Sequence, residues 1–198
     1  MLTFDDIIDS FARVCPKKIV VSDDIRSLSY SNLQFNGSNL ATFLKKCKII
    51  KGDRVAFLSY NRIEFAEILY ATSKSGTIIM PINFRLSKEE IASIVKDANP
   101  KILLYGKEFL KTINYLVKNN FLFKNMAICI DSKHYFKLLT KTKSTYPLNL
   151  KNSKKSDEWS LMYTSGTTGE PKGVIRNHEG YYHLSSITSI ELKIKKED

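Results

Sequence analysis

The sequence lacks the features that mark secreted, zinc-binding and membrane-spanning chains. Its three cysteines, Cys15, Cys47 and Cys129, are far apart and form no C-x-x-C pair, so neither a disulfide framework nor a zinc site is indicated. Residues 1–10 lack the basic start and apolar stretch of a secretory signal, and no run reaches the roughly 18 apolar residues that a membrane span needs. We therefore expect a cytoplasmic chain with reduced thiols and no membrane span.

Arginine is scarce, although the chain is strongly basic. The net charge is +11, but only 6 of the 31 basic residues are Arg and the other 25 are Lys. Planar bidentate recognition of bases and phosphates favours Arg, so we expect no nucleic-acid partner. Between Lys133 and Lys155 there are seven Lys and no acidic residue. We interpret residues 132–156 as a Lys-rich surface connection, with a binding site as the alternative.

Apolar runs alternate with amphipathic stretches along the chain. Helical spacing of apolar residues is found in five stretches: 4–11, 33–44, 62–75, 91–95 and 109–117. Runs typical of buried strands follow or separate them: KKIVVSDD, VAFLSY, TIIMPI, KILLY and MAICI. Gly76 is expected to end one helix, and Ser87 with Glu90 forms a capping-box pattern at the start of the next. This alternation predicts an α/β fold with a mainly parallel sheet and flanking helices.

Residues 164–173, TSGTTGEPKG, combine hydroxyls, glycines and one lysine directly after the apolar run WSLMY. Glycine permits close backbone approach, so successive N–H groups can converge on phosphate oxygens, while the hydroxyls and Lys172 add hydrogen bonds and charge. Composition alone leaves a solvent-exposed turn between two strands open as the alternative. The segment is neither a Walker A loop, because Lys172 follows Pro171 and precedes Gly173, nor a G-x-G-x-x-G dinucleotide loop.

The segment YTSGTTGEPKGV resembles the signature loop of the adenylate-forming family, which includes acyl- and aryl-CoA synthetases, luciferases and the adenylation domains of peptide synthetases. The similarity extends upstream through KGDRVAFLSYNRIEFAEILYATSKSG and MPINFRLSKEEIASIVKDANPKILL, and it covers most of residues 25–183. The resemblance implies that seven residues bind the β- and γ-phosphates of ATP: Thr164, Ser165, Gly166, Thr167, Thr168, Gly169 and Lys172. It also implies that Thr164 can contact Mg²⁺. In the same way it places His178, which ends the V-x-x-x-H motif, beside the carboxylate-substrate pocket.

By resemblance, the complete reaction has two steps. A carboxylic acid attacks the α-phosphorus of ATP and releases pyrophosphate, and the acyl-adenylate then passes to the thiol of CoA. Charge spreads over phosphate oxygens in the first transition state, so preorganised N–H, hydroxyl and Lys contacts lower the barrier without a protein nucleophile. We therefore assign no catalytic residue, and His134, His178 and His183 indicate no Ser/His/Asp arrangement. Fatty, aryl and amino acids all serve the family, and fatty acid metabolism is the context we expect.

The end of the chain departs from the family pattern. Complete relatives continue to an acidic Mg²⁺ ligand, a ribose-binding Asp, a hinge and a C-terminal domain with a catalytic Lys, whereas residues 179–198 indicate one more helix and a charged tail. We therefore expect residues 1–198 to form an incomplete N-terminal domain with an apolar edge or face left open, inactive alone. It would be a truncated product or one part of a split enzyme with a separately encoded downstream half. A noncatalytic nucleotide- or polyphosphate-binding protein and, on charge alone, a nucleic-acid-binding module are the other interpretations.

Overall fold

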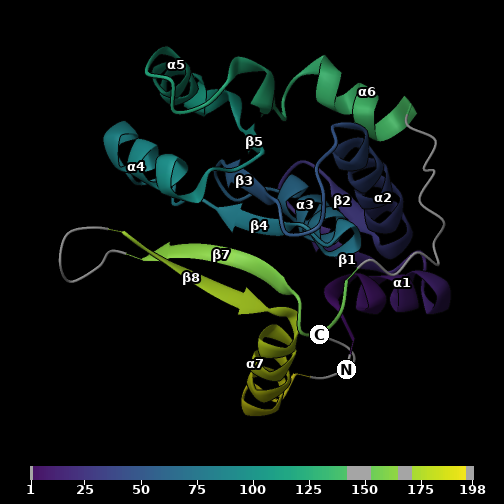
Figure 1. The fold of residues 1–198 in the computed structure, drawn as a ribbon. Coiled ribbons are helices and arrows are strands. Elements are labelled where there is room, and N and C mark those ends of the chain that lie inside the picture. The colour runs from purple at the N-terminus through teal and green to yellow at the C-terminus, as the bar shows by residue number, and fades with distance from the viewer. Residues whose placement is uncertain (1, 142–152, 165–170, 195–198) are drawn as a thin grey trace.

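The computed structural model describes residues 2–141, 153–164 and 171–194. Within these ranges the main sheet has the strand order β6-β5-β3-β4-β7-β8 (Figure 1). Its strands are β3 Arg54–Leu58, β4 Ile78–Pro81, β5 Ile102–Tyr105, β6 Ala127–Cys129, β7 Glu158–Thr164 and β8 Lys172–Asn177. Every neighbouring pair is parallel except β7 and β8, which form an antiparallel hairpin at one edge. The predicted α/β class and the mainly parallel sheet are confirmed.

Helices cover both faces of the sheet. Their bounds are α1 Phe4–Val14, α2 Tyr30–Lys46, α3 Glu64–Ser75, α4 Lys88–Ala98, α5 Leu110–Lys118, α6 Lys133–Lys141 and α7 His178–Glu191, with short 3-10 turns η1 Lys107–Phe109 and η2 Lys124–Met126. Side chains alternate along β3: Ala56 and Leu58 pack with α4 and α5, whereas Val55 and Phe57 pack with α2, α3 and α6. Two cores, one on each side of the sheet, follow from this alternation.

The helix ends confirm the capping patterns in the sequence. The Ser87 hydroxyl accepts a hydrogen bond from the Glu90 backbone N–H at 3.2 Å, and the Glu90 carboxylate accepts one from the Ser87 N–H at 2.7 Å. This reciprocal pair satisfies two backbone donors that a helix start leaves without partners. Gly76 ends α3 with φ of 73°, a left-handed conformation that suits glycine.

The first part of the Lys-rich segment is helical, which differs from the connection expected for residues 132–156. The Ser132 hydroxyl accepts from the Tyr135 N–H at 3.2 Å, so Ser132 caps α6. Tyr135 is fully buried, and its hydroxyl donates to Glu67 on α3 at 3.4 Å. One buried aromatic residue thus anchors a stretch whose composition indicated a loop. Residues 142–152 lie outside the described ranges. The structure also adds β2 (Ser27–Ser29), which pairs with β1 (Ile19–Ser22) in a separate two-stranded sheet.

A buried ionic network fastens α1 to α3. Lys74 is only 2% exposed, and its Nζ lies 2.6 Å from Asp9 Oδ2 and 3.8 Å from Asp5 Oδ2. The Tyr70 hydroxyl donates to Asp9 at 2.6 Å, and the Ser73 hydroxyl donates to Asp5 at 2.5 Å. Because each carboxylate has both a cation and a hydroxyl donor, the cost of burying these charges is offset by direct pairing.

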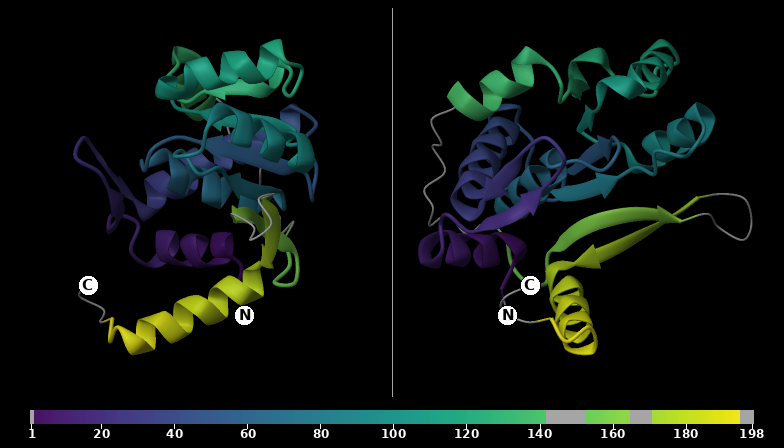
Figure 2. Two further views of the ribbon diagram at one scale, coloured as in Figure 1. Left: turned by 90° about the vertical axis from the view of Figure 1, so that its left-hand side faces the viewer. Right: turned by 180° about the vertical axis from the view of Figure 1, so that it is seen from behind.

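The β7–β8 hairpin and α7 leave apolar surface exposed at one edge of the sheet. An open apolar edge or face was expected there. Figure 2 shows the hairpin and α7 projecting from the rest of the molecule. Large apolar side chains on these two elements are at least one third exposed: Met162, Val174, Ile175, Tyr182, Leu184, Ile187 and Ile190. None of the helices in the described ranges is both long and apolar enough to cross a lipid bilayer.

Candidate phosphate-binding site

The phosphate-loop segment connects the two strands of the edge hairpin. Thr164, the last residue of β7, lies opposite Lys172, the first residue of β8. Directly opposed residues in an antiparallel pair have Cβ atoms about 5 Å apart. The side chains of Thr164 and Lys172 therefore leave the backbone at neighbouring positions. Both residues are exposed. The next helix begins at His178, beyond β8. Residues 164–173 were predicted to form a loop between two strands. Strands β7 and β8 flank this segment, but Thr164, Lys172 and Gly173 belong to the strands, and residues 165–170 lie outside the described ranges.

Five of the predicted phosphate-binding residues lie outside the described residues. They are Ser165, Gly166, Thr167, Thr168 and Gly169. Their contacts with phosphate therefore stay a prediction, together with those of Thr164 and Lys172. The structure places the two residues that flank this segment, Thr164 and Lys172, opposite each other.

The base of the loop is held to helix α4 by Tyr163. Its hydroxyl donates a hydrogen bond to the Asp97 carboxylate in the last turn of α4. Burial, followed by this hydrogen bond, raises the pKa of Tyr163, so the phenol keeps its proton. Across the hairpin, a Cβ at Gly173 would lie 2.9 Å from Leu161 Cδ1. Glycine at this position therefore allows β7 side chains to pack against β8 directly below the loop.

His178 lies at the opposite end of the hairpin from the loop. It is six positions along the chain from Lys172, which corresponds to about 20 Å of extended strand. The structure therefore does not bring His178 together with the phosphate-loop ends. It is the first residue of α7, whose N-cap is Asn177; the Asn177 side chain accepts from the Gly180 N–H at 2.8 Å.

The His178 ring is buried in an aromatic stack. It is 3% exposed and lies on Trp159 with ring centroids 4.7 Å apart and an interplanar angle of 15°. Trp159 in turn stacks on Phe4 of α1, with centroids 5.2 Å apart, and its indole N–H donates to Thr72 at 3.3 Å. Burial lowers the pKa of His178, which favours the neutral imidazole. Among the described residues, no hydrogen-bond partner faces its Nδ1.

A small cavity adjoins this stack. It has a volume of about 180 Å³, and its lining includes Phe4, Trp159, His178 and Tyr181. Pockets for drug-sized ligands measure about 300–1,000 Å³, so this cavity is smaller than a site for an extended acid substrate. His178 is thus linked to α1 through Trp159 of β7, and its substrate-binding role stays a prediction.

The described residues hold no preformed cluster of metal ligands. They contain no group of three or more His, Cys, Asp or Glu side chains arranged to hold a metal ion. Mg²⁺ is usually held by one or two carboxylates together with phosphate oxygens, and Thr164 alone does not meet this requirement.

Sequence reasoning missed the residues that support the loop. Asp97 is far from residues 164–173 in the sequence, and only the folded arrangement brings it to Tyr163. Trp159, the single tryptophan, is the second residue of β7, the strand that leads into the loop, and this position could have indicated an anchor. Its partners Phe4 and Thr72 lie in α1 and α3, so the pairing could not be read from local spacing.

The chain belongs to the AMP-binding enzyme family, whose model matches residues 8–198. It is 29% identical over 177 residues to long-chain-fatty-acid–CoA ligase FadD13 of Mycobacterium tuberculosis, with 89% of this chain and 35% of that protein covered. It is 30% identical over 167 residues to a feruloyl-CoA synthase of Amycolatopsis sp, with 84% and 32% covered. The chain thus spans about a third of the length of these curated relatives.

Solved structures agree with this assignment. A Mycobacterium tuberculosis fatty acyl CoA synthetase superposes with a TM-score of 0.81 at 27% identity, covering 91% of this chain and 35% of that one. The N-terminal domain of FACL13 from the same organism gives a TM-score of 0.80 at 28% identity, covering 92% of this chain and 46% of that domain. The expectation that the chain corresponds to an N-terminal portion of an adenylate-forming enzyme is confirmed.

Proposed function

We propose that this chain supplies the ATP-phosphate-binding part of a ligase that activates a carboxylic acid as its acyl-adenylate and transfers the acyl group to CoA. The observation that supports this most directly is the hairpin, which opposes Thr164 and Lys172 at the two ends of the signature segment. Lys172 would place its ammonium beside the terminal phosphates of ATP. Thr164 would donate its hydroxyl to the same oxygens, and the loop N–H groups would complete the contacts.

The chemical role of this site is electrostatic. Attack by the acid carboxylate breaks the bond between the α- and β-phosphates and leaves the new negative charge on pyrophosphate. Donors that are already in place when this charge develops lower the barrier. The hydrogen bond from Tyr163 to Asp97 would hold the base of the loop in place before ATP binds. Less conformational entropy would then be lost on binding.

The open edge supports a further part of the proposal. The chain covers 46% of a related N-terminal domain, and the apolar side chains of the hairpin and α7 stand exposed. Burying apolar surface is favourable by roughly 25 cal/mol per Å². A complex in which a polypeptide covers this edge would therefore be substantially stabilised. We propose that the covering polypeptide is the downstream part of the ligase, which would also supply the ribose contact and the mobile domain.

The test uses the purified chain in two assays. Binding of a fluorescent ATP analogue, with competition by pyrophosphate, measures the phosphate site, and acid-dependent CoA-ester formation measures the complete reaction. We expect phosphate-dependent binding and no CoA ester. Binding that pyrophosphate does not displace would contradict the phosphate site, whereas robust CoA-ester formation by the chain alone would contradict the need for a downstream part.

A noncatalytic nucleotide binder is the second candidate. It rests on the same opposed pair, Thr164 and Lys172, which would bind phosphates whether or not a reaction follows. It would bind ATP equally well with or without a downstream polypeptide, and addition of that polypeptide would produce no pyrophosphate exchange.

A further inference from the structure

The basic charge of the chain is concentrated in one part of the sequence. Residues 107–155 contain eleven lysines, no arginine and two acidic residues, Glu108 and Asp131, so they carry +9 of the chain's net charge of +11. Both acidic side chains are engaged elsewhere: Glu108 accepts from the Ser59 hydroxyl at 3.1 Å, and Asp131 accepts from the Arg62 guanidinium at 3.0 Å. Asp131 is thus shared with Arg62, whereas Glu108, whose partner is neutral, keeps its charge; the eleven lysines still far outnumber these two carboxylates.

The helices in this part present their lysines on one side. In α5, Lys111 and Lys118 are two helical turns apart and share a face, while Ile113 and Leu116 on the opposite face are buried. In α6, Lys133 and Lys137 are one turn apart, and the buried Tyr135 lies opposite them. We call the four exposed residues Lys111, Lys118, Lys133 and Lys137 the lysine face.

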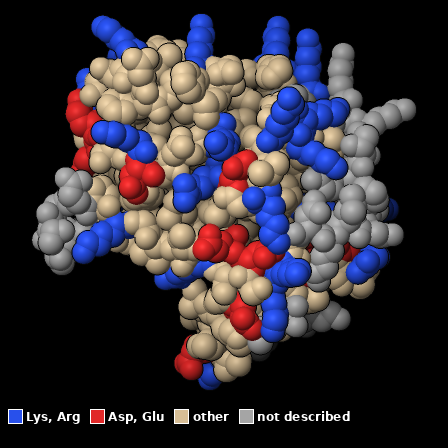
Figure 3. Space-filling model, viewed as in Figure 1, with Lys and Arg blue, Asp and Glu red and all other residues tan. Residues whose placement is uncertain are grey.

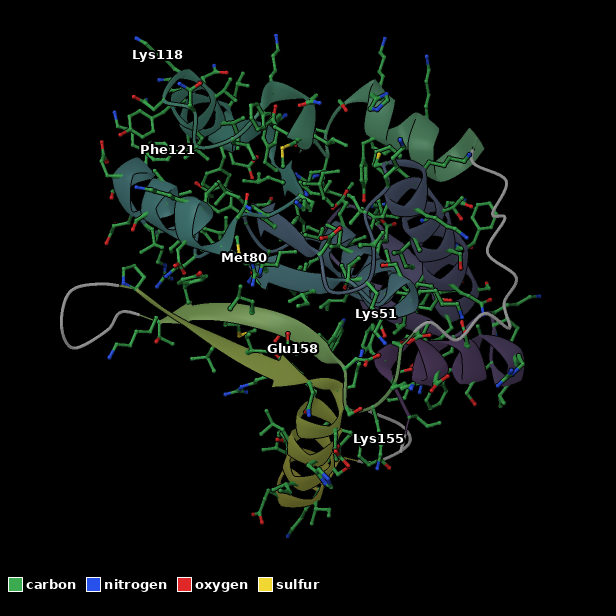
Figure 4. All side chains as sticks on the ribbon, in the orientation of Figure 1. Lys51, Met80, Lys118, Phe121, Lys155 and Glu158 are labelled. Atoms are coloured by element: carbon green, nitrogen blue, oxygen red, sulfur yellow. The ribbon has the colours of Figure 1, made fainter. Side chains whose placement is uncertain are left out.

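The lysine face lies along one margin of the molecule. In Figure 3, blue side chains project from the top of the view, over α5 and α6, and the red atoms lie below them. Figure 4 shows Lys118 pointing away from the fold at this margin. None of the ion pairs between described residues includes a member of the lysine face. Two large apolar side chains, Leu110 and Phe136, stand beside these lysines and are each 50% exposed.

We propose that the lysine face binds the surface of an anionic lipid membrane. Lysines near an anionic bilayer each contribute favourably through their charge alone, and exposed aromatic and aliphatic side chains can enter the headgroup region. Protein interfaces are depleted in lysine and enriched in arginine, and nucleic-acid recognition also favours arginine. A face with lysine as its sole basic residue type, flanked by Leu110 and Phe136, therefore fits a diffuse anionic surface better than either alternative. This inference does not depend on the phosphate site.

Cosedimentation with lipid vesicles tests the proposal. The full chain is mixed with phosphatidylcholine vesicles that contain either no phosphatidylserine or about 30% of it, at low salt and in about 0.5 M NaCl. We expect binding to the anionic vesicles at low salt, and a loss of at least tenfold when the four residues of the lysine face are changed to Gln. The matched control changes Lys17, Lys46, Lys96 and Lys101 to Gln, which removes the same charge from exposed sites elsewhere.

Three results would overturn the proposal. The first is equal binding to vesicles with and without phosphatidylserine. The second is an equal loss of binding in the lysine-face and control variants, which would indicate an effect of net charge alone. The third is tighter binding to a random-sequence DNA duplex than to anionic vesicles at the same salt concentration, which would assign the face to nucleic acid. Circular dichroism of both variants confirms that they are folded, since all eight side chains are exposed.

Discussion

Replacing Lys74 by Met tests the buried ionic network between α1 and α3. The Lys74 ammonium is 2% exposed and lies 2.6 Å from Asp9 Oδ2, with Asp5 Oδ2 at 3.8 Å. Methionine keeps the length of the side chain but leaves two carboxylates without their cation. Removing one partner of a buried pair costs about 3–5 kcal/mol, because an uncompensated charge stays buried. For a domain with a free energy of unfolding of about 5–15 kcal/mol, this is a large share.

The chain offers a matched control for this change. Lys51 Nζ also lies 2.6 Å from a carboxylate, Asp157 Oδ2, but the Lys51 side chain is 49% exposed. Exposed pairs contribute about 0–1 kcal/mol, so Lys51→Met should have little effect although the distance is the same. Urea denaturation followed by circular dichroism measures both free energies of unfolding. A loss in Lys74→Met no greater than that in Lys51→Met would refute the reasoning that burial decides the strength of the pair.

Two further changes have expected outcomes. Gly37→Ala should lower the free energy of unfolding by about 1–3 kcal/mol, because its Cβ would lie 2.3 Å from Cδ1 of the buried Tyr70; a melting temperature equal to that of the native chain would contradict this. Burial lowers the pKa of His178 below that of the unfolded chain, so the unfolded state binds the proton first and stability should fall as the pH drops below about 6.5. His178→Gln should flatten this pH dependence in thermal melts between pH 7.5 and 5, and an unchanged slope would exclude His178 as its source.

The main features of the fold could be predicted from sequence because they depend on local patterns. The capping box at Ser87 and the stop at Gly76 are set by residues within one helical turn, and buried strands such as Ile78–Pro81 read as apolar runs. Helix α6 was missed because Tyr135, a buried anchor near its start, contacts Glu67 in a distant helix. Local composition carries no signal for such a contact.

The candidate site could be predicted only in part, for a similar reason. The loop was identified from its glycines, hydroxyls and Lys172, and its place between two strands followed from the preceding apolar run. The support from Asp97 joins residues 66 positions apart, and sequence spacing does not reveal such a pair. His178 was assigned by resemblance, but its stack on Trp159, which in turn stacks on Phe4, gives it a second, structural explanation.

The central claim is that residues 164–173 bind the phosphates of ATP, and Lys172→Ala tests it most directly. A charge-assisted hydrogen bond contributes about 1.5–3 kcal/mol, so loss of the Lys172 ammonium should weaken ATP or pyrophosphate binding by about tenfold or more in titration calorimetry. Lys172 is exposed, so the free energy of unfolding should change by about 0.5 kcal/mol or less. Unchanged affinity together with a large fall in melting temperature would contradict the account and make the loop structural.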